Sequence, residues 1–265
     1  MNTSETATNS LARGLSETAT NSLARGLLVL EVISAEQPIG VGELSRMTGL
    51  PKSTVQRALR TLADAGWIEA TDDPQTRWGL SQKIRSIGHR AGDDLSLHQA
   101  ALPHLHWLRD QTQETIHFGI SVRDRSMLVI DRVDSNRAVR TFMAIGTAIP
   151  LHACASGKAV LAGWEERRLD RYIEAGLDDI TPTTITSASD LRRELQEVRD
   201  KGYAANFAEN REGVFAVGAA GAVQIDGAAA GISISMPDTR YDAGRVAEWG
   251  ELARETSARI DASLR

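Results

Sequence analysis

The chain has 265 residues, of which 42% are hydrophobic and 25% are charged, and its formal net charge is −5. This length and composition predict a soluble protein of two domains and exclude a collagen-like or a disordered chain. The single cysteine, Cys154, excludes an intramolecular disulfide and a multi-cysteine zinc site. We find neither the ~18 uninterrupted apolar residues of a membrane span nor a secretory signal, so we expect a cytoplasmic protein.

The chain begins with a tandem repeat, since Ser4–Leu15 and Ser16–Leu27 both read SETATNSLARGL. Solenoid proteins stack several diverged repeats around a shared core, whereas this chain has two identical copies, so the repeat does not indicate a solenoid. The second copy continues into an apolar pattern of helical period, whereas the first continues only into the second. We therefore interpret residues 1–20 as a duplicated leader that the fold does not need, either disordered or lengthening the first helix.

The elements predicted next follow the order of a winged helix-turn-helix DNA-binding domain over residues 21–80. Helices are expected at about 21–35, 41–47 and 52–65, and Gly49 and Pro51 form the turn before the third. A strand–turn–strand pattern over 67–80 predicts the wing, which Trp67 and Trp78 should pack against the helices. Residues 23–90 hold nine basic and seven acidic residues, so the net negative charge lies elsewhere.

The third predicted helix has two different faces. Val55, Leu59 and Leu62 form an apolar stripe, and the opposite face is polar and basic. Gln suits adenine and Arg suits guanine in the major groove, while lysines and hydroxyls suit phosphates. A helix whose solvent-exposed face is basic by chance is the alternative, which the turn and the wing disfavour. The predicted DNA contacts are Lys52, Ser53, Thr54, Gln56, Arg57 and Arg60 of this helix and Arg77 of the wing.

Residues 81–93 are predicted to form a linker helix, and residues 94–265 a larger α+β domain with one mixed or antiparallel sheet flanked by helices. The predicted helices are 95–111, 156–163, 165–174, 189–201 and 242–264. The predicted strands are 115–121, 126–133, 139–143, 203–208, 214–223 and 228–235.

From Ser22 to its C-terminus the sequence resembles the IclR family of bacterial transcription regulators. The stretches that carry the resemblance are SLARGLLVLEVI (22–33), IGVGELSRMTGLPKSTVQRALRTLADAGWIE (39–69), GTAIPLHACASGKAVLA (146–162), GYAANFAENREGV (202–214) and GISISMPDTRY (231–241). The resemblance implies a GAF-like C-terminal domain that binds a small metabolite and thereby alters DNA affinity. It also implies a homodimer or homotetramer on a palindromic double-stranded operator, with no cofactor and no membrane partner.

The resemblance also implies an effector pocket. Its predicted residues are Met143, Cys154, Ala155, Ser156, Asn206, Val214, Ala216, Ser233 and Ser235, with Phe215 as a further apolar wall. Ser156 opens a helix, whose free N–H groups favour an anion such as a carboxylate. Ser233 and Ser235 share one strand face, which is either the pocket or a solvated surface, and the apolar residues are either walls or plain core. Some relatives carry Asp at Asn206 and Cys at Ala216, so we expect a larger or aromatic acid rather than glyoxylate or pyruvate.

Two other functions have to be weighed. His152 and Cys154 could be the base and nucleophile of a hydrolase, but the sequence offers no third group to orient them, so we expect no catalytic residues. The histidines and carboxylates form no recognisable metal-binding pattern. Alternatively, the C-terminal domain of a DNA-binding protein could serve only for oligomerisation.

Overall fold

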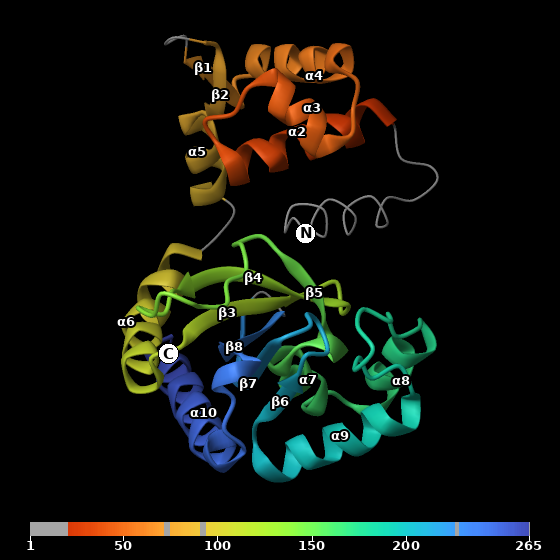
Figure 1. Cartoon of the computed structure of the whole chain (residues 1–265), viewed down its shortest axis with the longest axis vertical. Helices are drawn as coiled ribbons and strands as arrows, with labels where there is room; N and C mark the ends of the chain where they lie inside the picture. The colour runs from red at the N-terminus through yellow and green to blue at the C-terminus, as the bar shows by residue number, and fades with distance from the viewer. Residues whose placement is uncertain (1–20, 72–74, 91–93, 226–227, 265) are drawn as a thin grey trace. The chain divides into compact units, whose positions relative to one another are not determined.

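The computed structural model describes residues 21–71, 75–90, 94–225 and 228–264, and the chain divides into the units Met1–Leu95 and Ser96–Arg265 (Figure 1). Residues 1–20, with the first copy of the repeat, and the tip of the wing at 72–74 lie outside the described residues. The predicted limits of the leader, the linker and the two domains stay predictions.

The first unit has the predicted winged helix-turn-helix order. It comprises α2 (Asn21–Glu36), α3 (Val41–Thr48), α4 (Lys52–Asp64), the antiparallel pair β1 (Ile68–Thr71) and β2 (Arg77–Leu80), and α5 (Gln82–Arg90). Its core is formed by Val29, Ile33, Leu44, Val55, Leu59 and Ile68, and Trp67 and Trp78 pack against that core as predicted. Gly49, with φ of 68°, ends α3 in the left-handed conformation that the turn into α4 requires.

The second unit is built on a six-stranded antiparallel sheet. In spatial order its strands are β5 (Ala148–Pro150), β4 (Ser126–Val133), β3 (Thr115–Val122), β8 (Ala228–Pro237), β7 (Val214–Ile225) and β6 (Ala204–Phe207). One layer of helices contains α6 (Asp94–Thr112) and α10 (Val246–Ser263), and the other contains α7 (Ala155–Ala162), α8 (Glu166–Glu174) and α9 (Ala188–Lys201) (Figure 1). This confirms the predicted α+β class.

The two-residue period of the strands separates an apolar face from a polar one. Ile116, Ile232 and Ile234 are fully buried in the core that the sheet forms with α6 and α10. Ser233 and Ser235 alternate with these isoleucines and therefore face the layer of α7. The sequence pattern alone predicted this division of β8.

The predicted strand over 139–143 is wrong, because this segment is irregular and the sheet edge is instead β5. Side chains rather than a neighbouring strand bind its carbonyl groups. Arg240 donates to the Val139 carbonyl, Thr115 to that of Thr141 and Arg132 to that of Met143. Since these donors come from three separate elements, local periodicity could not reveal them.

The C-terminal helix also begins later than the predicted residue 242. Two short 3-10 turns, Asp238–Arg240 and Ala243–Arg245, precede α10, and the Asp242 side chain caps the second turn by accepting from the Gly244 N–H. In the part of the chain that the structure describes, no helix is both long and apolar enough to cross a membrane.

Candidate functional site

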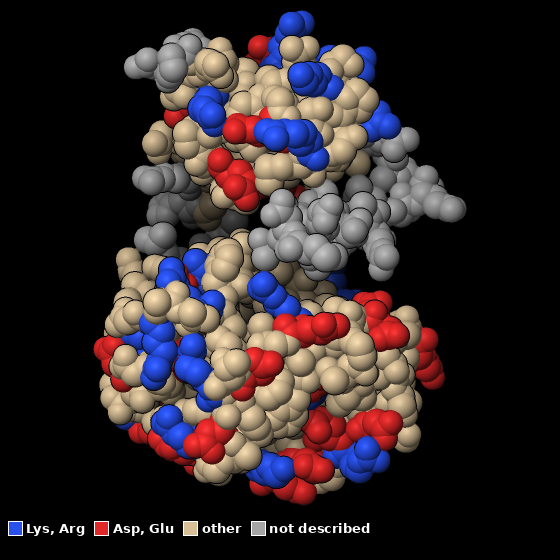
Figure 2. Space-filling model, in the orientation of Figure 1, with Lys and Arg blue, Asp and Glu red and all other residues tan. Residues whose placement is uncertain are grey.

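The outer face of α4, defined as Lys52, Ser53, Thr54, Gln56, Arg57 and Arg60, is turned to solvent. Thr54 is half-buried and the other five residues are exposed, while Val55 and Leu59 are buried beneath them. None of its three basic side chains forms an ion pair with another described residue. Figure 2 shows Lys and Arg side chains gathered over the part of this unit where Figure 1 places α4. The face therefore offers unpaired donors at the helix that such folds insert into the major groove.

Arg77, the predicted contact on the wing, is held differently. Its guanidinium donates to Glu43 Oε2 at 3.1 Å and to the Pro38 carbonyl at 3.0 Å. Glu43 also accepts the backbone N–H of Gly40 at 2.9 Å, and these contacts hold the pKa of Glu43 below its usual value. Arg77 thus ties the wing to the N-terminus of α3, and its contact with DNA stays a prediction.

In the second unit, α7 approaches the polar face of the sheet closely, and a cavity of about 50 Å³ lies beside its N-terminus. The approach depends on Gly218 of β7. A Cβ atom at this position would lie 2.6 Å from the carbonyl oxygen of Ile232 and 2.8 Å from the backbone nitrogen of Ser156. Glycine is therefore needed where helix and sheet meet.

The strand register gathers polar groups along the floor of this cavity. Ser235 is paired with Thr115 of β3 on one side and with Ala216 of β7 on the other, and Ala216 is paired with Asn206 of β6. Directly paired residues share a sheet face. Ser235 is only 6% exposed, and its hydroxyl has no partner among the described residues. The floor thus presents a hydroxyl that forms no hydrogen bond with a described residue.

The first turn of α7, which also lines the cavity, adds backbone donors. The N–H groups of Ala155 and Ser156 precede the first intrahelical bond, which runs from Lys158 N to the Cys154 carbonyl at 2.9 Å. Such N–H groups carry the positive end of the helix dipole. The cavity can therefore accommodate negative charge without a buried cation at its wall.

Asn206 occupies the cavity wall, but its amide also holds the backbone together. Its Nδ2 donates to the Ala153 carbonyl at 2.7 Å, and its Oδ1 accepts from the Glu209 N–H at 3.3 Å. These bonds join β6 and the loop after it to the segment that leads into α7. Asn206 is thus partly a positioning residue for the cavity.

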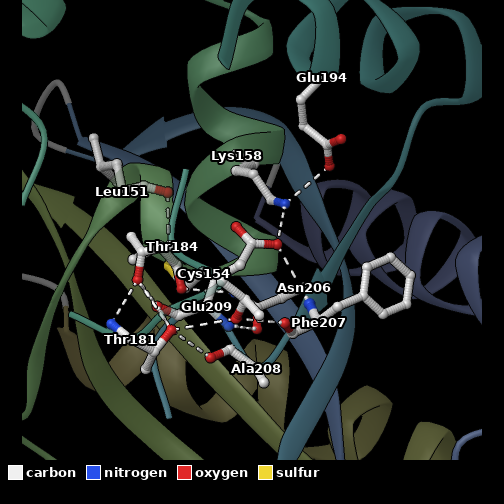
Figure 3. A network of polar contacts seen from close by, with 12 residues as sticks. Leu151, Cys154, Lys158, Thr181, Thr184, Glu194, Asn206, Phe207, Ala208 and Glu209 are labelled. Carbon is white, nitrogen blue, oxygen red and sulfur yellow. Dashed lines mark hydrogen bonds and ion pairs between the residues drawn. The ribbon is translucent and has the colours of Figure 1, made fainter. Parts of the chain in front are cut away.

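A buried ionic network stands behind Asn206 (Figure 3). The ammonium of Lys158, whose side chain is fully buried, binds Glu209 at 2.8 Å and Glu194 of α9 at 2.9 Å. Burial raises the pKa of Glu209, and the Lys158 ammonium opposes that shift. Hydroxyls of Thr181 and Thr184 bind the Glu209 carbonyl, so the loop after β6 is fixed from both sides. The positive charge of Lys158 is therefore balanced by the two glutamates, so this residue is not the counter-ion of a ligand.

Comparisons with known proteins identify the family. Residues 22–72 match the family model described as the IclR helix-turn-helix domain, and residues 89–262 match the one described as bacterial transcriptional regulator IclR C-terminal. The chain belongs to the IclR family. It is therefore a DNA-binding transcription regulator with a C-terminal ligand-binding domain, not an enzyme.

Relatives support the assignment along almost the whole chain. The HTH-type transcriptional regulator KdgR of Escherichia coli is 31% identical over 238 residues, which cover 89% of each chain. The transcriptional repressor AllR of the same organism is 28% identical over 225 residues, 84% of this chain and 82% of AllR. The solved IclR of Thermotoga maritima superposes with a TM-score of 0.71 at 26% identity, covering 92% of this chain and 98% of that one.

The IclR C-terminal domain brings all nine predicted pocket residues to the same cavity. They are Met143, Cys154, Ala155, Ser156, Asn206, Val214, Ala216, Ser233 and Ser235. Phe215, predicted as a further wall, instead packs with Phe207 and Tyr241, at 5.5 Å and 4.8 Å between ring centroids, because the strand period turns it to the other face of β7. That the nine residues bind an effector stays a prediction.

Sequence reasoning missed eleven further residues of the cavity wall. His117 lies directly beside Ser233 in the sheet, and the irregular segment that follows β4 contributes two side chains. Strand alternation could have placed His117 opposite Ile116 and Phe118, but nothing in the sequence reveals that β3 pairs with β8. The missed residues are His117, Phe118, Gly119, Met127, Val129, Thr141, Phe142, Ile149, Ala153, Asn210 and Arg211.

His152 and Cys154 do not form a base–nucleophile pair. Burial raises the pKa of the Cys154 thiol to about 11, so the thiol stays protonated at neutral pH. Both ring nitrogens of His152 have other partners, the Tyr172 hydroxyl at 2.7 Å and the Asp178 carbonyl at 3.0 Å. His152 therefore has a structural role in positioning the segment before α7.

Proposed function

We propose that this IclR-family protein binds a small organic acid in the cavity beside α7 and that the acid changes its affinity for a specific operator. The observation that carries the proposal is the cavity itself, which is lined by both the N-terminus of α7 and Ser235. A carboxylate would accept hydrogen bonds from the backbone N–H groups of Ala155 and Ser156 and from Ser235. A larger or aromatic acid is favoured over glyoxylate or pyruvate by Asn206 and Ala216.

The charges around the cavity support an anionic effector. Lys158, a buried cation within α7, is paired with two glutamates. Arg211 lies at the cavity, is exposed, and has no ion pair with any described residue. A free guanidinium at the entrance would attract an acid from solvent, and the helix N-terminus would then hold its carboxylate.

On the DNA side, the outer face of α4 would read base edges through Gln56 and Arg57 and contact phosphates through the remaining polar residues. Two copies of α4 would fit a palindromic operator. An oligomer is also supported by α2, where Leu23 and Leu27, one helical turn apart, are 64% and 47% exposed. A homodimer or homotetramer would cover such a stripe of leucines. The effector would act on the two α4 helices through α5 and the residues after it.

A thermal-shift screen of the full chain against aliphatic and aromatic carboxylic acids tests the proposal. A ligand at 100 times its Kd stabilises the native state by about 2.7 kcal/mol, which corresponds to a rise in Tm of about 5–10 °C. We expect such a rise for the wild type and for the control Ser189→Ala, an exposed serine of α9, but not for Ser235→Ala. No rise with any acid would contradict an acid sensor and favour a C-terminal domain that only oligomerises.

A further inference from the structure

Two buried polar atoms at the cavity have no hydrogen-bond partner in the described structure. One is Nε2 of His117, a residue only 7% exposed, and the other is Oγ1 of Thr141, a residue only 8% exposed. Both residues line the cavity. Buried polar atoms are nearly always hydrogen-bonded, so two unpartnered atoms in one cavity indicate a group that is supplied from outside the chain.

His117 and Thr141 lie away from the predicted carboxylate position, on the β4 side of the floor. His117 is paired with Ser233 on one side and with Arg132 of β4 on the other. The carbonyl of Thr141 is bound by the Thr115 hydroxyl, which fixes the Thr141 backbone over β3. The Thr141 carbonyl is therefore already in use, while the imidazole and the Thr141 hydroxyl remain available.

Arg132, the charged neighbour of His117, is not available to a ligand. Its guanidinium donates to the Met143 carbonyl at 2.6 Å, pairs with Asp134 at 2.5 Å, and lies 4.6 Å from the centroid of the Phe142 ring. These contacts hold the irregular segment over the cavity. They leave His117 and Thr141 as two buried polar groups that a ligand could reach on this side.

The imidazole of His117 is neutral at physiological pH. Burial and, to a lesser extent, the nearby Arg132 guanidinium lower its pKa to about 4, against the opposing effect of Asp134. A neutral imidazole cannot balance a carboxylate, but it can accept or donate one hydrogen bond at Nε2. The Thr141 hydroxyl can do the same. A ligand group that donates and accepts through a single atom, as a hydroxyl does, complements this pair.

We infer that His117 and Thr141 form a second polar subsite that binds a hydroxyl of the effector, so that the effector is a hydroxy acid. This inference rests on the proposed function, since the carboxylate of the same molecule would lie at α7 and Ser235. The ligand hydroxyl donates to one of the two side chains and accepts from the other. The subsite therefore favours acids that carry this hydroxyl over acids that lack it.

The inference is tested by isothermal titration calorimetry of the full chain with matched acids that differ by one hydroxyl, such as propionate with 3-hydroxypropionate and benzoate with its hydroxybenzoates. We expect at least one hydroxy acid to bind the wild type about 10-fold or more tightly than its partner without the hydroxyl. In His117→Phe and in Thr141→Val this advantage should fall below about 3-fold, with the affinity for the simpler acid changed less than about 3-fold.

Thr141→Val keeps the shape of the side chain and removes an unpartnered buried hydroxyl, so we expect it to fold at least as well as the wild type. Ser235→Ala should weaken both members of a pair alike. Equal binding of matched acids to the wild type would overturn the hydroxyl subsite and leave the acid sensor standing, and so would an advantage that both variants retain. If no acid bound at all, both the sensor and the subsite would be overturned.

Discussion

The outer face of α4 and the cavity beside α7 both present polar groups without protein partners, but the two places differ in what satisfies those groups. Lys52, Gln56 and Arg57 are exposed, so water satisfies them and α4 needs no DNA in order to fold. At the cavity, His117 and Thr141 are buried, and the backbone around them is fixed by contacts from distant segments. Substitutions on α4 should therefore change binding alone, whereas substitutions around the cavity should change stability as well.

The largest effect is expected for Lys158→Met, because this variant leaves Glu209 and Glu194 without their buried counter-charge. Removing one partner of a buried ion pair costs about 3–5 kcal/mol of unfolding free energy, which urea denaturation of the C-terminal unit would measure. The double variant Lys158→Met/Glu209→Gln should recover part of the loss. Lys201→Met, which breaks an exposed pair with Glu197, is the matched control and should have a small effect.

The next effect concerns pH. The folded-state pKa of His117 is about 4, against 6.5 for a free histidine, so the unfolded chain takes up a proton first as the pH falls. The contribution of His117 to the unfolding free energy, about 3 kcal/mol, is fully present above pH 6.5 and is lost as the pH falls towards 4. His152, whose pKa is also lowered by burial, adds to the same trend. In His117→Phe, the unfolding free energy measured by denaturation should fall less between pH 7 and pH 4 than in the wild type. An equal fall in both proteins would disprove that His117 is buried in its neutral form.

Gly218→Ala should cost about 1–3 kcal/mol, because its methyl group would meet the Ile232 carbonyl and the Ser156 nitrogen at under 3 Å. It should also weaken binding of the acid, since α7 must move away from the sheet. Gly42→Ala is the matched control on α3. Nothing lies within 4 Å of a Cβ atom there, so this variant should gain about 0.5–1 kcal/mol. Equal Tm values for the two variants would show that the contact at Gly218 is unimportant.

The smallest effect on stability is expected for Arg57→Ala, since the side chain is exposed and forms no ion pair with a described residue. Its effect on binding should be a loss of about 1–3 kcal/mol of preference for the operator over altered duplexes. Fluorescence anisotropy with matched duplexes measures both affinities. Lys52→Ala should weaken binding to all sequences alike, and an unchanged preference in Arg57→Ala would exclude base reading by this residue.

The sequence predicts a region well when the interactions that shape it are between residues close together in the chain. The two faces of α4 follow from helical periodicity, and the shared face of Ser233 and Ser235 follows from strand periodicity. The role of His117 depends on the pairing of β3 with β8, which local patterns do not encode. The error at 139–143 has the same origin, because the carbonyls of that segment are bound by side chains of other elements.

Asn206 shows the limit of a resemblance. The family pattern placed it at the pocket, and it does line the cavity. Its amide, however, bonds Ala153 and Glu209, and only the folded backbone brings those two groups to it. Ser235→Ala is therefore a cleaner probe of the ligand than a change at Asn206, which would also loosen the loop after β6.

The central claim is that an acid in the C-terminal cavity controls DNA binding, and operator affinity measured with and without that acid tests it most directly. A duplex selected by the protein from a random library would be titrated by fluorescence anisotropy at a saturating concentration of an acid that raises the Tm. We predict at least about a 5-fold change in Kd for the wild type and for Ser189→Ala, and none for Ser235→Ala. An unchanged Kd for the wild type, or an equal response in Ser235→Ala, would contradict the account.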